Sequence, residues 1–229
     1  MNTKRNLTLL KNIVMRKFYS PESNKKVIDE FHKLFYDSQT YNKVYWLGAS
    51  ASKCPFDLFI YQEILYDIKP DIIIECGTAQ GGTTYFLATV CDLIGKGKII
   101  SMDIEDNPKK PIHKRIKYIT GSSTDEGVFN LIKSSIKPSD IVLVILDSAH
   151  NKEHVLKELN MYNSLVTKGS YLIVEDSNLN GNPIFPTYGP GPKEAIDEFM
   201  KENNDFAADK EKEKFFLTFN PNGYLKKIK

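Results

Sequence analysis

Three acidic residues follow two strongly apolar stretches of the sequence. Asp147 comes directly after the run 141–146, and Glu175 and Asp176 come directly after the run 170–174. If the two runs are neighbouring strands, the three carboxylates meet at one edge and repel one another unless a cation lies between them. Carboxylate oxygens suit Mg²⁺ or Ca²⁺ better than Zn²⁺. The pattern therefore predicts a divalent metal site at Asp147, Glu175 and Asp176. Helix capping, or pairing with lysine, is the alternative.

One histidine stands close to these acids. His150 follows Asp147 by three residues, and an imidazole can accept a proton near neutral pH. Asp147 and His150 are therefore candidates for a role in catalysis. A surface helix cap is the alternative role for His150. The stretch 150–154 also matches the H-x-x-E-H pattern of zinc peptidases. That pattern needs both histidines within a helix, and His150 is expected to precede the helix.

A glycine-rich stretch follows the first strand-like run. It reads Glu75-Cys-Gly77-Thr-Ala-Gln-Gly81-Gly82-Thr83, and glycine lets a ligand approach the backbone where a helix begins. The spacing differs from the G-x-G-x-x-G of dinucleotide sites, which disfavours a nicotinamide-dependent oxidoreductase. The alternative to a ligand-binding loop is a plain turn between a strand and a helix.

Two further positions suit a nucleoside. Asp103 ends the next strand-like run, where a carboxylate can accept hydrogen bonds from ribose hydroxyls. After the third run, Ser122 and Ser123 carry hydroxyls that can hydrogen-bond an adenine, although serine is equally ordinary in loops and at helix caps. The residues predicted to bind a cofactor are Glu75, Gly77, Gly81, Gly82, Thr83, Asp103, Ser122, Ser123 and Asp147.

The elements that must position these residues alternate along the chain. From residue 70 onward, apolar runs alternate with segments of helical spacing, as expected for parallel strands covered on both faces. The predicted strands are 71–76, 98–103, 116–120, 141–146 and 170–174, and a hairpin of 214–219 with 223–228 follows. We predict an α/β fold with a doubly wound, mostly parallel seven-stranded sheet in a domain of residues 70–229. Residues 1–69 are predicted to form a basic arm and a helical cover.

The composition excludes several classes of protein. The longest aliphatic run, 141–146, is far shorter than the roughly 20 apolar residues that span a bilayer. The net charge of +2 predicts no nucleic-acid partner. Residues 1–26 carry seven basic side chains and one acid. This arm could contact an acidic partner or another subunit in a homo-oligomer, and a solvated amphipathic helix is the alternative. Three cysteines without paired spacing indicate free thiols and a cytoplasmic protein.

Several strings of the sequence resemble known families. The pattern acid-x-Gly-x-x-x-Gly-Gly at 75–82 resembles motif I of class I S-adenosylmethionine-dependent methyltransferases. Resemblance to the cephalosporin hydroxylase family covers roughly residues 40–228. It is carried by Trp46-Leu-Gly48, Lys53-Cys-Pro55-Phe-Asp57, Leu146-Asp-Ser-Ala-His150, Gly169-Ser-Tyr-Leu-Ile-Val-Glu-Asp176 and Phe215-Phe-Leu-Thr-Phe-Asn-Pro221. That family has the methyltransferase fold and is similar to rhamnosyl and macrocin O-methyltransferases.

The resemblance implies a function. It implies S-adenosylmethionine as the cofactor, with Asp103 on the ribose and Ser123 on the adenine, and Mg²⁺ or another divalent cation at the three acids. In the related metal-dependent O-methyltransferases the metal grips a substrate with neighbouring hydroxyls. Catechol-type enzymes carry a lysine that takes the hydroxyl proton where this chain has His150, so the resemblance implies that His150 is the general base. The implied acceptor is a hydroxyl of a sugar or a glycosylated metabolite. A non-catalytic member that binds adenosylmethionine within an assembly is the alternative.

Aromatic residues flank the predicted site in sequence. Tyr45, Trp46, Phe185 and Tyr188 could stack on a sugar ring, although core packing is the more frequent use of such residues. The Pro- and Gly-rich loop 181–192 is expected to act as a lid on the substrate side.

Overall fold

The sheet that organises the molecule has seven strands. The computed structural model describes residues 20–229, and the strands lie in the order β5-β4-β3-β6-β7-β9-β8. Their bounds are β3 (Ile72–Cys76), β4 (Lys98–Asp103), β5 (Ile116–Thr120), β6 (Val142–Leu146), β7 (Tyr171–Val174), β8 (Phe206–Ala208) and β9 (Tyr224–Lys227). β3 to β7 pair in parallel, and β9 runs antiparallel to both β7 and β8. This confirms the predicted doubly wound, mostly parallel sheet.

The antiparallel pair near the C-terminus is present, but its first strand lies earlier in the chain than predicted. β8 supplies that strand, and the segment 214–219 has no strand conformation. Leu217 and Phe219 are instead buried with Cys54, against part-buried rings of α2 (Lys25–Asp37) and the turn that follows it. Phe216 has a positive φ of 69°. The prediction of strand 214–219 was wrong because these apolar side chains pack against helical elements and not into the sheet.

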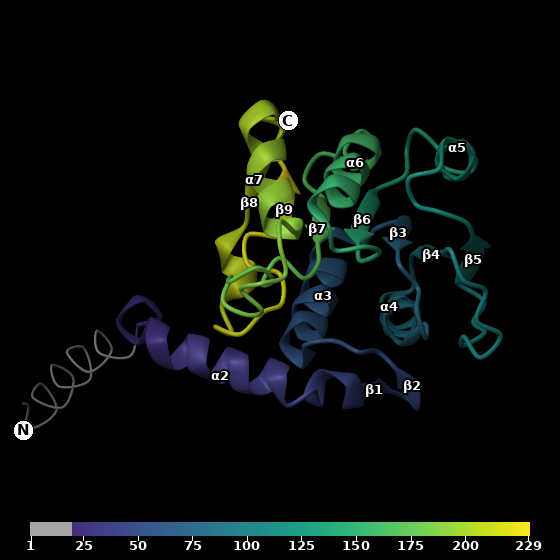
Figure 1. Cartoon of the computed structure of the whole chain (residues 1–229). Coiled ribbons are helices and arrows are strands. Elements are labelled where there is room, and N and C mark those ends of the chain that lie inside the picture. The colour runs from purple at the N-terminus through teal and green to yellow at the C-terminus, as the bar shows by residue number, and fades with distance from the viewer. Residues whose placement is uncertain (1–19) are drawn as a thin grey trace, which may run out of the picture.

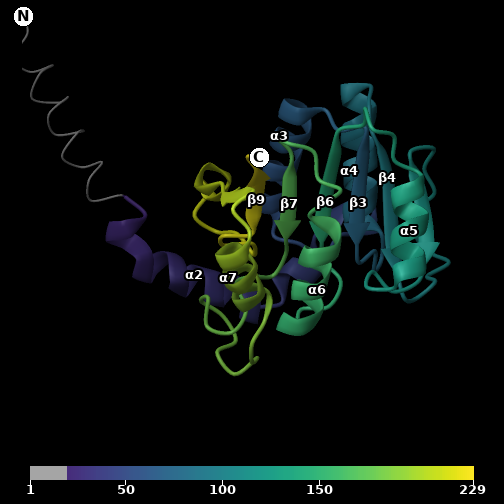
Figure 2. The same cartoon turned by 90° about the horizontal axis from the view of Figure 1, so that it is seen from above.

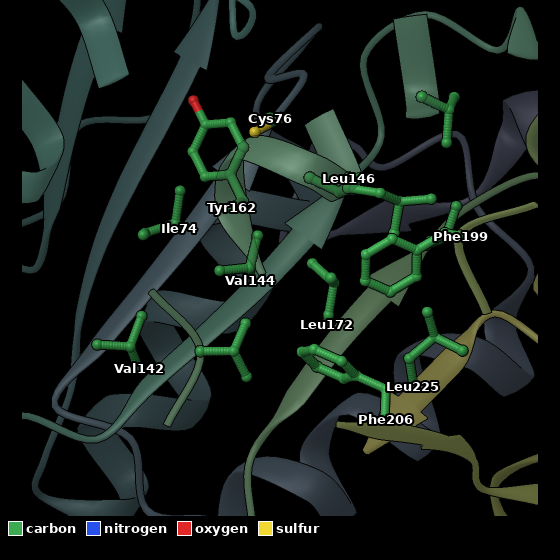
Figure 3. Close-up of a cluster of buried hydrophobic side chains, with 14 of the residues drawn as sticks. Ile74, Cys76, Val142, Val144, Leu146, Tyr162, Leu172, Phe199, Phe206 and Leu225 are labelled. Atoms are coloured by element: carbon green, nitrogen blue, oxygen red, sulfur yellow. The ribbon is translucent and has the colours of Figure 1, made fainter. Parts of the chain in front are cut away.

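Helices cover both faces of the sheet. α3 (Pro55–Ile68) and α4 (Gly82–Ile94) lie on one face, and α5 (Glu126–Ser134), α6 (Lys152–Tyr162) and α7 (Pro192–Glu202) lie on the other (Figures 1 and 2). Successive strand residues alternate between the two faces. Ile74 and Val144 share a hydrophobic cluster with α6 and α7 (Figure 3). Ile73 and Ile145 share the opposite cluster with α3 and α4. Burial on both faces explains why the strands are apolar at consecutive positions.

The segment before the sheet combines helices with a small antiparallel ladder. α2 follows η1 (Glu22–Asn24) and precedes η2 (Thr40–Lys43), and β1 (Tyr45–Trp46) pairs with β2 (Ala49–Ser50). α2 lies across the edge of the molecule at which the parallel strands end (Figure 2). α3 contributes Ile64 and Leu65 to the same hydrophobic cluster as β3. Residues 1–19, which hold most of the predicted basic arm, lie outside the described residues.

The cysteines and the helices agree with expectations from the composition. Cys54, Cys76 and Cys91 are buried free thiols. Within residues 20–229, no helix is both long enough and apolar enough to span a bilayer.

A buried carboxylate ties α3 to the C-terminal segment. Asp57, in the first turn of α3, is fully buried. Its oxygens accept hydrogen bonds from the Thr218 hydroxyl at 2.5 Å, the Phe219 backbone N–H at 2.8 Å and the Tyr224 hydroxyl at 2.8 Å. Burial raises the pKa of Asp57 to about 7, although the hydrogen bonds from Thr218 and Phe219 oppose the shift. This network holds the chain after η3 (Lys210–Glu213) beneath α2.

Asp57→Ala should lower the free energy of unfolding by about 2–4 kcal/mol, because buried donors of Phe219 and Tyr224 lose their acceptor. Urea denaturation at pH 7 measures this loss. Glu202→Ala removes an exposed acid at the end of α7 and should change the same quantity by less than about 0.5 kcal/mol. Equal, small effects of the two substitutions would contradict a structural role for Asp57.

Candidate functional site

The glycine-rich loop allows an unusually close approach of backbone segments. Gly77 follows β3 with a φ of 98°, and a Cβ at this position would lie 2.0 Å from the backbone oxygen of Asp147. At the start of α4, a Cβ on Gly82 would lie 2.1 Å from the backbone oxygen of Ser50. Gly81 caps α4 with a φ of 77°, and Thr83 donates a hydrogen bond to the Ala51 carbonyl. The loop therefore brings β3, β6 and the β2 segment together at one point.

Glu75 does not face this loop. Its carboxylate is fully buried and accepts hydrogen bonds from the Thr84 hydroxyl at 2.5 Å and the Ser101 hydroxyl at 2.6 Å. Burial raises the pKa of Glu75 to about 7, against the effect of these two hydrogen bonds. The structure thus places Glu75 inside the protein, where it joins β3, β4 and the first turn of α4, and not beside the other predicted cofactor residues.

Asp103 and the two serines do lie around one cavity. This cavity of about 200 Å³, here named the β4 cavity, is lined by Gly77, Asp103, Ser122, Ser123 and Asp147 among others. Asp103 Oδ2 accepts the backbone N–H groups of Thr78 and Ala79, at 3.0 and 2.8 Å. The structure therefore brings together five of the predicted cofactor residues, and Asp103 also fixes the glycine-rich loop.

His154 is a lining residue of the β4 cavity that the sequence did not single out for this role. Its Nε2 lies 3.1 Å from the hydroxyls of both Ser123 and Ser148. Ser148 donates a hydrogen bond of 2.6 Å to the buried carboxylate of Glu158. The helical spacing of His154 and Glu158, four residues apart in α6, was the available signal.

The acids after β6 and β7 converge with His150. One ligand atom each from Asp147, His150 and Asp176 lies within 4.8 Å of the others. His150 Nε2 is 3.1 Å from Asp176 Oδ2. These three residues line a second cavity of about 360 Å³, here named the acid cavity, which also includes Gly77 and Thr83. Because both cavities are bounded by Gly77 and Asp147, the acids and the glycine-rich loop adjoin one another.

Glu175 lies behind this cluster and is fully buried. Its Oε1 accepts a hydrogen bond from the Tyr61 hydroxyl and lies 2.9 Å from Lys53 Nζ. Its Oε2 is buried without a hydrogen-bond partner among residues 20–229. Burial raises the pKa of Glu175, in opposition to Lys53. The structure thus separates Glu175 from the three-residue cluster but leaves one of its oxygens unsatisfied.

Lys53 is the cation of the site that sequence reasoning missed. Its ammonium is almost completely buried and lies 2.6 Å from Asp147 Oδ2. Burial opposes the charge of Lys53, but Asp147 and Glu175 outweigh it and hold the pKa of Lys53 well above its usual value. The expectation that the acids pair with a lysine is therefore met in part. The sequence could not identify the lysine, because it lies 94 residues before Asp147.

The donor set fits a divalent cation. Carboxylate oxygens of Asp147 and Asp176, together with an imidazole nitrogen, are ordinary ligands for such ions. The unsatisfied Oε2 of Glu175 is a further acceptor without a donor. A zinc-peptidase pair is not formed, because His150 precedes α6 and lines the acid cavity, whereas His154 lines the β4 cavity.

The aromatic residues divide between the core and the site. Trp46 packs edge-on against Phe86 and donates a hydrogen bond to Thr89. Tyr188, from the loop 181–192, lines the acid cavity. The ring centroids of Phe185 and Tyr188 are 5.6 Å apart. The loop therefore reaches the site through Tyr188, and its action as a lid stays a prediction.

Known proteins resemble most of this chain in sequence. The family model described as Rhamnosyl O-methyltransferase/CmcI matches residues 38–228. A rhamnosyl O-methyltransferase of Mycobacterium tuberculosis is 37% identical over 216 residues, which cover 91% of this chain and 87% of that protein. A rhamnosyl O-methyltransferase of Mycobacterium leprae is 37% identical over 206 residues, which cover 87% of this chain and 90% of that protein.

Several solved protein structures have a fold similar to that of this chain. The apo structure of CmcI matches with a TM-score of 0.65 at 20% identity and covers 82% of this chain and 77% of its own. CmcI with Mg and SAM matches with a TM-score of 0.60 at 19% identity, over 82% and 78% of the two chains. An O-methyltransferase from Bacillus cereus in complex with SAH matches with a TM-score of 0.52 at 14% identity, over 88% and 89%. At these identities the likeness concerns the fold alone.

Glu75→Gln should stabilise the protein at high pH but not at low pH. The folded-state pKa of about 7 lies above the ordinary 4.5, so the stability contribution of protonated Glu75 is complete below pH 4.5 and is lost as the pH rises through 7. The variant should therefore gain up to about 3 kcal/mol relative to the wild type between pH 5 and pH 8. Urea denaturation at both pH values measures the gain.

Glu105→Gln, a change at an exposed acid beyond β4, serves as the control and should show no such dependence. A difference between Glu75→Gln and the wild type that stays constant from pH 5 to pH 8 would contradict the raised pKa.

Proposed function

The chain belongs to the Rhamnosyl O-methyltransferase/CmcI family, and from this premise we propose that it transfers a methyl group from S-adenosylmethionine to a sugar hydroxyl with the help of a divalent metal. The observation that carries the proposal is the meeting of two cavities at Gly77 and Asp147. One cavity has the polar groups that a nucleoside needs, and the other has the acids and the histidine that a metal-bound hydroxyl needs.

In this proposal the β4 cavity holds the nucleoside of the cofactor. Asp103 accepts hydrogen bonds from the ribose with the lone pairs that the backbone N–H groups of Thr78, Ala79 and Glu105 leave free. Ser122 and Ser123 face the adenine. Gly77, Gly81, Gly82 and Thr83 place the backbone of the loop and the start of α4 beside the remaining part of the cofactor. Glu75 supports the loop from within and makes no contact with the cofactor.

The metal site of the proposal uses Asp147, Glu175 and Asp176. Asp147 and Asp176 face the acid cavity, and Glu175, which lies behind them and directly precedes Asp176, would offer its unsatisfied oxygen as the third acceptor. When bound, Mg²⁺ or a similar ion lowers the pKa of a substrate hydroxyl and fixes its position. Asp147 borders both cavities, so a metal bound to it would place the acceptor hydroxyl next to the cofactor.

His150 is the proposed general base. It lies at the rim of the acid cavity, and its Nε2 is 3.1 Å from Asp176 Oδ2. The carboxylate of Asp176 stabilises the imidazolium that forms when His150 takes the hydroxyl proton. A bound cofactor would supply the methyl group for that oxygen, and His150 would hold the proton.

A rhamnosyl hydroxyl is the proposed acceptor. The relatives at 37% identity are named rhamnosyl O-methyltransferases, and the match spans most of both chains. Tyr188 and Tyr36 line the acid cavity and offer aromatic faces for the apolar face of a deoxysugar.

Three free, buried thiols are consistent with a reducing, cytoplasmic location. Assembly into a homo-oligomer remains part of the proposal.

S-adenosylmethionine should raise the melting temperature, and NAD should not, because a ligand of the native state stabilises it by mass action. At about 100 times the dissociation constant, the expected stabilisation is roughly 2.7 kcal/mol. Asp103→Ala should weaken the binding of S-adenosylmethionine about 10- to 100-fold in isothermal titration calorimetry. Asp106→Ala, at a mostly exposed acid nearby, is the control. No thermal shift with saturating S-adenosylmethionine would refute the proposed activity.

His150→Gln should lower kcat about 10²- to 10⁴-fold, because the hydroxyl proton loses its acceptor. The assay follows methyl transfer to a rhamnoside by mass spectrometry, with and without Mg²⁺. His113→Gln, at a histidine paired with Asp92 away from both cavities, should retain full activity. Binding of Mn²⁺ to His150→Gln should match the wild type. Weaker Mn²⁺ binding would assign His150 to the metal, and unchanged turnover would remove it from catalysis.

A further inference from the structure

Lys53 occupies a position between two of the proposed metal ligands. Its ammonium lies 2.6 Å from Asp147 Oδ2 and 2.9 Å from Glu175 Oε1, and its side chain is 5% exposed. No part of the proposed function uses this charge. A lysine buried so deeply among acids is uncommon, because burial of an ammonium is costly unless it is paired.

The residues that follow Lys53 hold its backbone in this position. Cys54, the next residue, is fully buried and caps α3, with Pro55 in the first turn of the helix. Cys54 packs in the cluster that contains Leu217 and Phe219. Because its neighbour is fixed in the core, the backbone of Lys53 is held at the start of α3, and its buried side chain meets the acids there. Its contact with the acids is therefore a built feature of the fold.

The positive charge of Lys53 repels a metal ion that binds at the same acids. Asp147, Glu175 and Asp176 carry a formal charge of −3, and Lys53 reduces it to −2. The ammonium takes one oxygen of Asp147 and one of Glu175, so a metal that binds both acids shares its ligands with a positive charge. In a site of low dielectric, such a neighbour weakens the binding of a second cation. The same ammonium relieves the repulsion between the acids when no other cation is bound.

We propose that Lys53 is an internal cation that competes with the divalent metal for Asp147 and Glu175 and thereby sets the metal affinity of the site. The inference rests on the proposed metal site. It makes metal binding partly dependent on the substrate, because the hydroxyls of a bound sugar supply ligands that Lys53 does not share. The metal is then held weakly by the protein alone and more firmly in the presence of the acceptor.

Lys53→Met, which keeps an unbranched side chain one atom shorter than lysine and removes its charge, tests this proposal. After treatment with EDTA, Mn²⁺ binding is measured by electron paramagnetic resonance. The dissociation constant of the variant should fall by about tenfold or more, because the repulsion is gone. Without metal, the variant should also melt at a lower temperature than the wild type, and saturating Mn²⁺ should restore much of the difference.

Two further variants separate charge from packing. Lys53→Arg keeps the charge and should bind Mn²⁺ like the wild type. Lys214→Met removes a lysine that pairs with Glu63 at the surface and should leave the Mn²⁺ affinity unchanged. If Lys53 served only to hold the acids in place, Lys53→Met would bind Mn²⁺ more weakly. A dissociation constant that rises or stays the same would overturn the proposal.

The outcomes also distinguish this proposal from the proposed function. Mn²⁺ binding by the wild type with no gain in Lys53→Met overturns the role of Lys53 alone. No Mn²⁺ binding by either chain overturns both. If Lys53→Met is unfolded in EDTA, recovery of its circular dichroism spectrum on addition of Mn²⁺ supports the proposal. A second variant, Lys53→Gln, covers the case in which Mn²⁺ does not restore the spectrum of Lys53→Met. If Lys53→Gln then binds Mn²⁺ no more tightly than the wild type, the proposal is contradicted.

Discussion

The ion pairs of Lys53 with Asp147 and Glu175 are the interaction on which the site depends. Parallel strands β6 and β7 are neighbours, so the acids that follow them must lie close together. Their mutual repulsion would oppose folding unless a positive charge lay between them. Lys53 supplies this charge from the segment before α3. The position of α3 on the sheet and the positions of the acids therefore depend on each other through Lys53.

The same constraint explains the polar network behind the site. Tyr61 of α3 donates to Glu175, and Asn220 donates to the Tyr61 hydroxyl at 3.2 Å. Asp57, one turn earlier in α3, binds the chain around Phe219. These contacts join the start of α3, the end of β7 and the C-terminal segment around a buried charge. Because buried polar groups need partners, the network fixes the segments that contribute them, and the acid cavity takes its shape from those segments.

Local patterns predicted the strand ends well, and they failed where distant segments meet. Asp103 and Asp147 could be placed because a parallel sheet aligns its carboxyl ends at one edge. Glu75 points inward although it lies in the same motif as Gly77, because the hydroxyls of Thr84 and Ser101 offer it buried partners. Lys53 and Tyr61 lie 94 and 114 residues before the acids that they contact. No periodicity of the sequence reports such separations.

Several places where the structure departs from ordinary packing rules lie at the site. Gly77 and Gly82 lie where a methyl group would collide with backbone atoms, and Glu175 Oε2 is buried without a donor. A second such oxygen, Glu158 Oε2, lies on the carboxylate that holds Ser148 beside the β4 cavity. Each of the two unsatisfied oxygens destabilises the fold by itself. Unsatisfied oxygens beside two adjoining cavities fit a binding site, because groups arranged to meet a ligand cannot all be satisfied by the protein alone.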